Sequence, residues 1–257
     1  MAFRARRNQV ITLPDTYQLL HFETLDSTNE EAKRLAAQGV FQPHWILADA
    51  QNAGRGRRGR VWESPKGNLM TTVYQPGRIE TEKAGQLSFV AGLALADTVS
   101  SLIGSDGAVS IKWPNDVLVG GAKISGILLE SGAASDAHLD WVCVGMGLNL
   151  AHFPDNTPYL ATSIAAHTGH RPDNLAVLEV LASAFDRYYR QWQEFGFSVI
   201  VTKWRQQAHN LGREIIVRLE KSELSGIFED IDDTGALILC SEDGERHIVS
   251  AGDVFFR

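Results

Sequence analysis

The sequence predicts an α+β protein in which a large domain of strands and helices precedes a small domain of strands alone. Two patterns along the 257 residues support this fold class. Up to about residue 210, short apolar runs alternate with segments whose apolar residues recur every three or four positions. From Gly212 onward, short β segments alternate with turns rich in Asp and Gly. We therefore expect an N-terminal arm over residues 1–20, a main domain over residues 21–210 and a small all-β barrel over residues 211–257.

The main domain is expected to open with a strand over residues 19–25 and a helix that ends near Gly39. Ser27 with Glu30, or Thr28 with Glu31, can form a capping box at the start of that helix. A Pro76-Gly77 pair is expected to close a later strand, and Gly120-Gly121 is expected to form a hairpin turn. The remaining strands of this domain are expected at residues 45–50, 69–74, 109–113, 117–119, 123–130 and 141–150, and the remaining helices at 86–103 and 175–195. The strands of the tail are expected at residues 214–219, 225–231, 236–240 and 247–256.

Composition places the chain among ordinary globular proteins, because 44% of its residues are hydrophobic and 21% are charged. The longest uninterrupted apolar run, residues 89–96, is far shorter than the roughly 20 residues that cross a bilayer. The basic start of the chain leads into polar residues and lacks the apolar core of a signal peptide. We therefore expect a cytoplasmic protein without a membrane segment. Cys143 and Cys240 lie in apolar runs and are expected to be reduced, buried thiols.

Charge is distributed unevenly between the two predicted domains. Residues 212–257 hold 11 acidic and 5 basic residues, a net charge of −6, which disfavours contact with nucleic acid. The first 20 residues are too short for a separate helix-turn-helix domain. By contrast, Arg55, Arg57, Arg58 and Arg60 fall within six residues, and this local positive charge is suited to an anion.

The glycines among these arginines, Gly54, Gly56 and Gly59, satisfy the pattern G-x-G-x-x-G. A dinucleotide-binding motif would require a helix to start there, whereas a turn-rich stretch follows. A kinase would also need H-R-D and D-F-G elements, and neither occurs in the sequence. Glycines allow backbone N–H groups to approach an anion, and arginines add paired donors that match carboxylate or phosphate oxygens. The alternative for the loop alone is a flexible, solvated turn.

Four segments together resemble the biotin protein ligase family, in their order as well as their residues. They are Ser27-Thr28-Asn29; Gln51 to Arg60 with Trp62 behind it; Lys112-Trp113-Pro114-Asn115-Asp116 with Lys123 to Leu128; and Gly145 to Leu150. The resemblance runs from about residue 20 to the end of the chain. It implies a mixed β-sheet flanked by helices, of the fold shared with class II synthetases, and an SH3-like barrel at the C-terminus. It also implies a monofunctional ligase without an N-terminal DNA-binding domain.

In this family, biotin reacts with ATP to give biotinyl-5′-AMP, and biotin then passes to one lysine of the biotin carboxyl carrier domain of acetyl-CoA carboxylase. The resemblance implies magnesium as a cofactor beside ATP, with no ligand residues assigned. The implied catalytic residues are Lys123, Arg55 and Arg57. The implied biotin-binding residues are Ser27, Thr28, Asn29, Gln51, Arg55, Gly56, Arg57, Lys123, Gly126 and Gly147. The implied residues of the ATP site are Arg58, Trp62, Asn115, Asp116 and Asn149.

Simpler interpretations exist for several of these residues. Ser27 and Thr28 are also typical helix caps, Asn115-Asp116 is a common turn, and an aromatic such as Trp62 can belong to a core. His167 and His170 lack further metal ligands nearby and favour a surface loop over a zinc site. Alternative functions are a lipoate-type ligase or acyltransferase of the same fold, and a ligase with a regulatory binding role that does not involve DNA. We expect no nucleic-acid or membrane partner, and the sequence leaves a homodimer open.

Overall fold

A computed structural model describes residues 11–104, 108–132, 134–157 and 159–256. Residues 1–10, half of the predicted N-terminal arm, lie outside these ranges, and the first strand already begins within the arm at Gln18. The strands of the main part are β1 (Gln18–Phe22), β2 (His44–Ala48), β3 (Leu69–Glu80), β4 (Val109–Lys112), β5 (Asp116–Val119), β6 (Ala122–Ser131), β7 (Ala134–Ser135) and β8 (His138–Leu148). The helices are α1 (Thr28–Ala37), α2 (Thr81–Ala84), α3 (Leu87–Ile103), α4 (Ile164–Thr168), α5 (Asn174–Phe195) and α6 (Phe197–Gln207).

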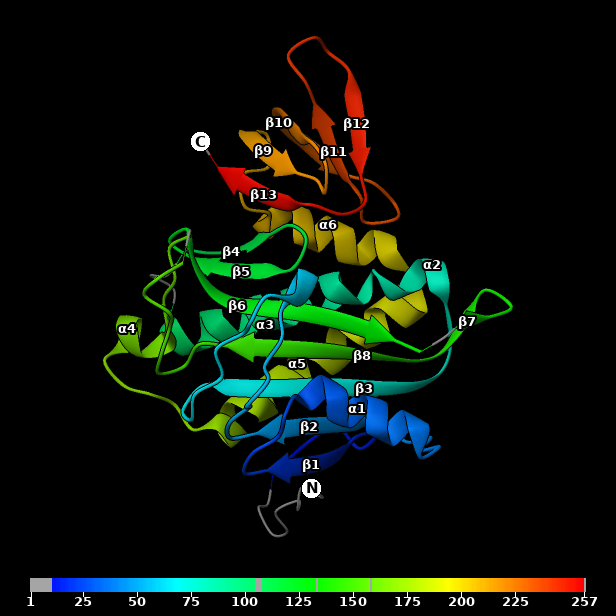
Figure 1. The fold of residues 1–257 in the computed structure, drawn as a ribbon, viewed down its shortest axis with the longest axis vertical. Helices are drawn as coiled ribbons and strands as arrows, with labels where there is room; N and C mark the ends of the chain where they lie inside the picture. Colours follow the sequence, from blue (N-terminus) through cyan, green and yellow to red (C-terminus); the bar gives the residue numbers. More distant parts are fainter. Residues whose placement is uncertain (1–10, 105–107, 133, 158, 257) are drawn as a thin grey trace.

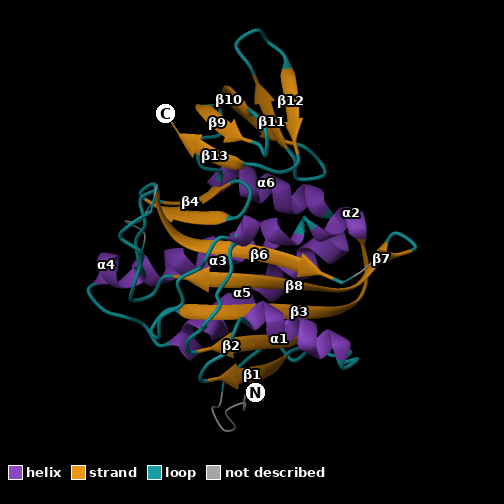
Figure 2. Cartoon of the chain, in the orientation of Figure 1, coloured by secondary structure: helices purple, strands orange, loops and turns teal. Residues whose placement is uncertain are grey.

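These strands form one mixed sheet in the order β1-β2-β3-β8-β6-β5-β4, with β7 paired to β8 (Figure 1). Strand β1 runs parallel to β2, and the other neighbours are antiparallel. The sequence of β2 explains why helices cover both faces, because all five of its residues are buried. Trp45 and Leu47 join the core that α3 and α5 cover, while Ile46 and Ala48 pack with α1 on the other face. The predicted mixed sheet flanked by helices is confirmed (Figure 2).

Helix α3 lies in the centre of the larger core, and 11 of its residues are buried. With α2 it forms a segment, Thr81–Ile103, that is long and apolar enough to cross a membrane by length and composition alone. Two thirds of its most apolar window (67%) is nevertheless buried within the protein, as in the core helix of a soluble protein. The prediction from uninterrupted apolar runs did not find this segment, because polar residues such as Thr98 divide it into shorter runs.

The C-terminal β domain consists of β9 (Glu214–Arg218), β10 (Glu223–Ile231), β11 (Leu237–Cys240), β12 (Arg246–Val249) and β13 (Asp253–Phe256). They pair antiparallel in the order β12-β11-β10-β9-β13. The domain sits beside α6, where the rings of Trp204 and Phe228 lie 6.5 Å apart (Figure 1). The Trp113 indole N–H also donates to the Gly235 carbonyl oxygen at 3.0 Å. The two parts therefore share one continuous core.

Some element boundaries differ from those predicted. Strand β3 continues past Pro76-Gly77 to Glu80, because a register shift between Pro76 and Ile79 lets the strand pass a residue without an N–H donor. The last predicted strand is two strands, β12 and β13, separated at residues 250–252. The hairpin at Gly120-Gly121 is confirmed between β5 and β6. Helices α2, α4 and α6 and strand β7 were not predicted. Both cysteines are free, and Cys143 is buried as predicted whereas Cys240 is only partly buried.

We expect Gly235→Ala to destabilise the protein, because Gly235 has a φ of +92° and an added Cβ would lie 2.7 Å from the Phe89 ring. The expected loss of unfolding free energy is about 1–3 kcal/mol, from overpacking and backbone strain together. Chemical denaturation measures it. Gly244→Ala is the matched control, because Gly244 has a φ of +84° but nothing within 4 Å. Equal losses in the two variants would contradict a packed junction between Phe89 and the C-terminal β domain.

Candidate functional site

A cavity of about 410 Å³ opens on the face of the sheet opposite α3 and is referred to below as the site cavity. Its floor comes from β3, β6 and β8, and its walls come from the segment between β2 and β3, the turn before β5, and β13. In Figure 1 the segment between β2 and β3 crosses in front of β6 and β8 toward the C-terminal β domain. The site cavity therefore draws on segments from almost the whole length of the chain.

The structure brings nearly all the predicted site residues together around the site cavity. The predicted residues that line it are Ser27, Thr28, Asn29, Gln51, Arg55, Gly56, Arg57, Trp62, Asn115, Asp116, Lys123, Gly126 and Gly147. Arg58 lies at its edge, paired with Asp253, which lines the cavity. Asn149 is not brought to the cavity. Its side chain is 3% exposed and donates to the Thr162 carbonyl oxygen at 3.0 Å, so its contacts hold the end of β8 in place.

Neutral polar side chains occupy one end of the site cavity. The backbone N–H and the hydroxyl of Thr28 donate to Gln51 Oε1 at 2.7 and 3.1 Å. The Thr72 hydroxyl lies 2.7 Å from both the Thr28 hydroxyl and Asn29 Oδ1. Ser27 is the N-cap of α1, but its side chain makes no capping hydrogen bond. The predicted capping box is therefore wrong, because Thr28 turns toward Gln51 and Thr72 instead.

Glycines on β6 and β8 make room for the Trp62 ring against the sheet. A Cβ at Gly147 would collide with the indole of Trp62, and a Cβ at Gly126 would lie 3.0 Å from it. Lys123 Nζ lies 5.5 Å from the centre of the same ring, within range of a cation–π contact. Trp62 thus presents an aromatic surface inside the site cavity rather than in the core that α3 and α5 cover.

Lys123, on β6, is the cation on the floor of the site cavity. Its Nζ lies 2.6 Å from Asp116 Oδ1, and the two side chains are 16% and 15% exposed. The Tyr159 ring lies 5.2 Å from the same Nζ. The carboxylate and the two aromatic rings already restrict the Lys123 side chain to few rotamers. Binding an anion therefore costs little further conformational entropy, and the ammonium group is preorganised for negative charge.

The arginine loop, residues 54–60, borders the site cavity on the side of the C-terminal β domain. Arg57 donates to Asn115 Oδ1 and to the Gly252 carbonyl oxygen, both at 3.3 Å. Burial lowers the pKa of the Arg57 guanidinium, because a cation removed from water is less stable. Arg58 and Arg60 reach Asp253 on β13 at 3.2 and 2.7 Å. The loop is therefore attached to the C-terminal β domain by three of its four arginines.

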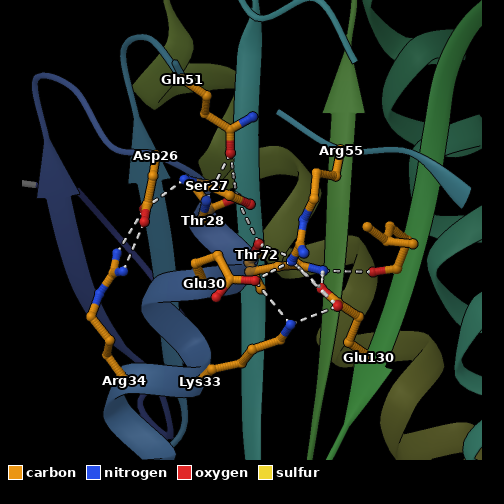
Figure 3. A network of polar contacts seen from close by, with 12 residues as sticks. Asp26, Ser27, Thr28, Glu30, Lys33, Arg34, Gln51, Arg55, Thr72 and Glu130 are labelled. Atoms are coloured by element: carbon orange, nitrogen blue, oxygen red, sulfur yellow. Dashed lines mark hydrogen bonds and ion pairs between the residues drawn. The ribbon is translucent and has the colours of Figure 1, made fainter. Parts of the chain in front are cut away.

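The fourth arginine, Arg55, points away from these contacts. Its guanidinium pairs with Glu30 on α1 and lies 3.2 Å from Glu130 Oε2 on β6 (Figure 3). Two carboxylates of the protein therefore already neutralise the Arg55 guanidinium. A substrate carboxylate would have to compete with them, so the expectation that Arg55 contacts the substrate stays a prediction.

Sequence reasoning missed several residues that shape the site cavity or its surroundings, among them Lys112, Glu130, Asp253 and Phe255. Lys112 is part of the quoted Lys-Trp-Pro-Asn-Asp segment, so the motif itself could have indicated it. Its Nζ lies 5.8 Å from the centre of the Phe255 ring, and burial lowers its pKa. Asp253 and Phe255 lack a local signal, because they reach the arginine loop and Lys112 only through the tertiary fold.

Among the residues that the structure describes, no group of three or more His, Cys, Asp or Glu side chains is placed to hold a metal ion. His167 lies on α4 rather than in a loop, and its Nε2 lies 3.0 Å from the Thr162 hydroxyl. The expected surface loop at His167 is corrected to a short helix, while His170 follows that helix.

Residues 21–149 match the Biotin/lipoate A/B protein ligase family, and residues 211–257 match the Biotin protein ligase C terminal domain. The chain belongs to the biotin/lipoate A/B protein ligase family. Within that family, the Biotin--[acetyl-CoA-carboxylase] ligase of Paracoccus denitrificans is 45% identical over 238 residues, covering 90% of this chain and 97% of the relative. The Bifunctional ligase/repressor BirA of Bacillus subtilis (strain 168) is 33% identical over 239 residues, covering 91% of this chain and 72% of the relative.

Solved structures of the family agree with the fold. The biotin protein ligase from Aquifex aeolicus in complex with biotin and ATP superposes with a TM-score of 0.75 at 26% identity, covering 93% of this chain and 98% of that one. The match to the C-terminal domain of biotin protein ligases separates this chain from members of the family that lack that domain. The resemblance drawn from the four sequence segments is confirmed.

Proposed function

We propose that this protein is a biotin protein ligase, which activates biotin with ATP and transfers it to a lysine of the biotin carboxyl carrier domain of acetyl-CoA carboxylase. The observation that carries the proposal is the composition of the site cavity. One cavity combines neutral polar groups, an aromatic surface and a set of cations, in a chain of the biotin/lipoate ligase family. The 45% identity to a Biotin--[acetyl-CoA-carboxylase] ligase over most of both chains supports the choice of substrates.

The neutral end of the site cavity suits the ureido ring of biotin. That ring is uncharged and carries two N–H donors and one carbonyl acceptor. Thr28, Asn29 and Gln51 supply hydroxyl and amide groups there, and they are already linked to one another or to Thr72 by hydrogen bonds. Binding a neutral, polar ring therefore requires little reorganisation. Apolar lining residues such as Met70 and Leu128, which lie outside the core that α3 and α5 cover, suit the aliphatic chain of biotin.

The cationic end suits adenylation. The biotin carboxylate attacks the α-phosphorus of ATP, an acyl phosphate bond forms, and pyrophosphate leaves with the electron pair of the broken bond. Two anions about 4 Å apart repel by roughly 4 kcal/mol at an effective dielectric constant near 20. Lys123 and Arg57 stand where they can offset this repulsion, and the Trp62 ring offers a surface for stacking adenine. In the second step, the amine of the carrier lysine attacks the acyl carbon and AMP leaves.

The carboxylates that would hold magnesium are Asp116 and Asp253, which are paired with Lys123 and with Arg58 and Arg60 and would have to exchange these partners for the ion. Magnesium is usually held by one or two carboxylates together with the substrate's phosphates, and both aspartates line the site cavity. When bound, the ion would neutralise charge on the leaving pyrophosphate.

The decisive experiment is a mass-spectrometric assay of the purified protein with biotin, ATP and magnesium. We expect biotinyl-5′-AMP and pyrophosphate, and biotinylation of a single lysine when the carrier domain is added. Lipoate and octanoate are the controls, because the main alternative is a lipoate-type ligase or acyltransferase. Adenylation of lipoate in preference to biotin would overturn the proposal.

The remaining partner predictions are also testable. A net charge of −6 in the C-terminal β domain disfavours a nucleic-acid partner, and we expect no retardation of duplex DNA at physiological ionic strength. Retardation would contradict the expectation that the chain has no nucleic-acid partner. We propose a cytoplasmic location without a membrane partner, which cell fractionation tests. Light scattering with and without biotin and ATP decides whether the chain forms a homodimer.

We expect trypsin to cleave the arginine loop more slowly once biotin and ATP are bound. Three of the loop arginines are held by partly exposed ion pairs to Glu30, Glu130 and Asp253, which constrain the loop only weakly until a bound anion adds further contacts. The rate of cleavage at residues 55–60 should fall about tenfold or more with both ligands present. Arg246, an exposed arginine paired with Glu229, serves as the internal control site. Equal cleavage rates with and without ligands would count against loop ordering.

A further inference from the structure

Glu130 lies where the neutral end of the site cavity meets the arginine loop (Figure 3). It extends from β6 toward the start of α1, and its side chain is 24% exposed. Glu130 Oε2 accepts a hydrogen bond from Asn29 Nδ2 at 2.9 Å, and Oε1 lies 2.8 Å from Lys33 Nζ. Arg55 Nη2 lies 3.3 and 3.2 Å from Oε1 and Oε2. One carboxylate therefore receives donors from α1 and from the arginine loop.

Asn29 is fixed in orientation by this carboxylate. Its Nδ2 donates to Glu130 and to the Leu128 carbonyl oxygen at 3.1 Å, while its Oδ1 accepts from the Thr72 hydroxyl. With donors on one side and an acceptor on the other, the amide has one satisfied orientation. The side chain is 3% exposed and lines the site cavity, so a ligand there meets an amide that Glu130 holds.

The charges around Glu130 are balanced. Glu30 and Glu130 face Lys33 and Arg55, which gives two carboxylates and two cations in contact. Burial alone would raise the pKa of Glu130, but hydrogen bonds from Lys33 and Asn29 outweigh it, and the pKa lies below its usual value. Loss of the Glu130 charge would leave one cation in excess and would remove one contact of Asn29 and one contact of Arg55 together.

We propose that Glu130 is a positioning residue that couples the biotin pocket to the arginine loop by holding Asn29 and Arg55 with one carboxylate. The inference rests on the proposed function, since it takes biotin as the ligand that meets Asn29. Biotin bound to Asn29 stabilises the position of Glu130 in which the Glu130 carboxylate also contacts Arg55. By thermodynamic linkage, an arginine loop that is held by this contact must raise the affinity for biotin by the same factor.

Glu130→Gln in the full-length protein tests the coupling, with Glu30→Gln as the matched control. The hydrogen bonds of Glu30 go to Lys33 and Arg55, whereas Glu130 also holds Asn29. We expect Glu130→Gln to weaken biotin binding about tenfold, as for loss of a hydrogen bond to a charged group. At saturating biotin, it should also lose the slowing of trypsin cleavage in the arginine loop. Glu30→Gln should keep the affinity for biotin within about twofold of the wild type. Trypsin should cleave its arginine loop faster than that of the wild type, but biotin should slow this cleavage by the same factor as in the wild type.

Calorimetry with biotin alone and timed trypsin digestion measure the two quantities. If biotin protects the loop of Glu130→Gln by the same factor as in the wild type, the inference is overturned. If the wild-type protein fails to bind biotin, the proposed function fails instead. Glu130→Asp keeps the charge on a shorter side chain and is the second variant should Glu130→Gln not fold. It should lose part of the protection, and full protection in Glu130→Asp would also overturn the coupling.

Discussion

Lys123→Ala is expected to abolish formation of biotinyl-5′-AMP, with a fall in the rate of adenylation of about 10²–10³-fold or more. The Lys123 ammonium lies on the floor of the site cavity, beside Asp116 and between the rings of Trp62 and Tyr159. Removing it takes away a largely buried positive charge that lines the site cavity. Rapid-quench measurement of the pre-steady-state burst of pyrophosphate, with biotin and ATP in excess over the enzyme, gives the rate. A burst at the wild-type rate would contradict the assignment of Lys123.

The same change has a structural side effect that can be separated from catalysis. Without Lys123, the largely buried Asp116 carboxylate loses its ion-pair partner, which costs about 1–3 kcal/mol of unfolding free energy. Adding Asp116→Asn should recover most of that stability without restoring adenylation. Lys83→Ala is the surface control, since Lys83 pairs with Glu80 and both side chains are about half exposed.

Arg57→Gly is expected to retain some adenylation but to release biotinyl-5′-AMP about 30–100-fold faster, as for loss of a charge-assisted contact to a phosphate. Arg57 is the loop arginine whose guanidinium reaches across to Asn115 and to the Gly252 carbonyl oxygen. Because both partners are neutral, its charge remains available to an anion. The off-rate of radiolabelled adenylate measures the effect, and an unchanged off-rate would contradict this role.

Arg58→Gly is the matched control within the same loop. Arg58 has a φ of 55°, a conformation that glycine adopts without strain, and its guanidinium pairs with Asp253. We therefore expect a smaller rise in the off-rate than in Arg57→Gly. A larger rise would place the anion beside Arg58 instead.

The sequence predicted the residues of the site cavity better than their contacts. Short motifs indicated Gln51, Trp62 and Lys123 because each motif keeps its ligand-facing groups within a few residues. The capping box failed for a physical reason, since Thr28 had partners on β3 and in the segment after β2 that no local pattern reveals. Asn149 was grouped with the ligand site because it ends a motif, yet its amide holds the chain after β8.

Long-range pairing explains what sequence reasoning could not reach. Glu130 meets Asn29 only because β6 pairs with β8 while α1 lies across the same face of the sheet. The ends of strands were similarly hard to predict, since Pro76 would stop a regular strand but is accommodated by an irregular register. The division near residue 210 stays a prediction, based on the change in the spacing of apolar residues along the chain.

The attachment of Arg58 and Arg60 to Asp253 has a consequence for how the site forms during synthesis. These ion pairs join residues 195 and 193 positions apart, so the loop leaves the ribosome long before its partner. Contacts of such separation form late, because the intervening chain must first be ordered. Until β13 pairs with β9, the side chains of the arginine loop are held through Arg55, which contacts Glu30 and Glu130, and through Arg57, which donates to Asn115. Ligand binding at full strength therefore requires β13, and biotin capture by stalled chains of increasing length should rise sharply once β13 has been synthesised.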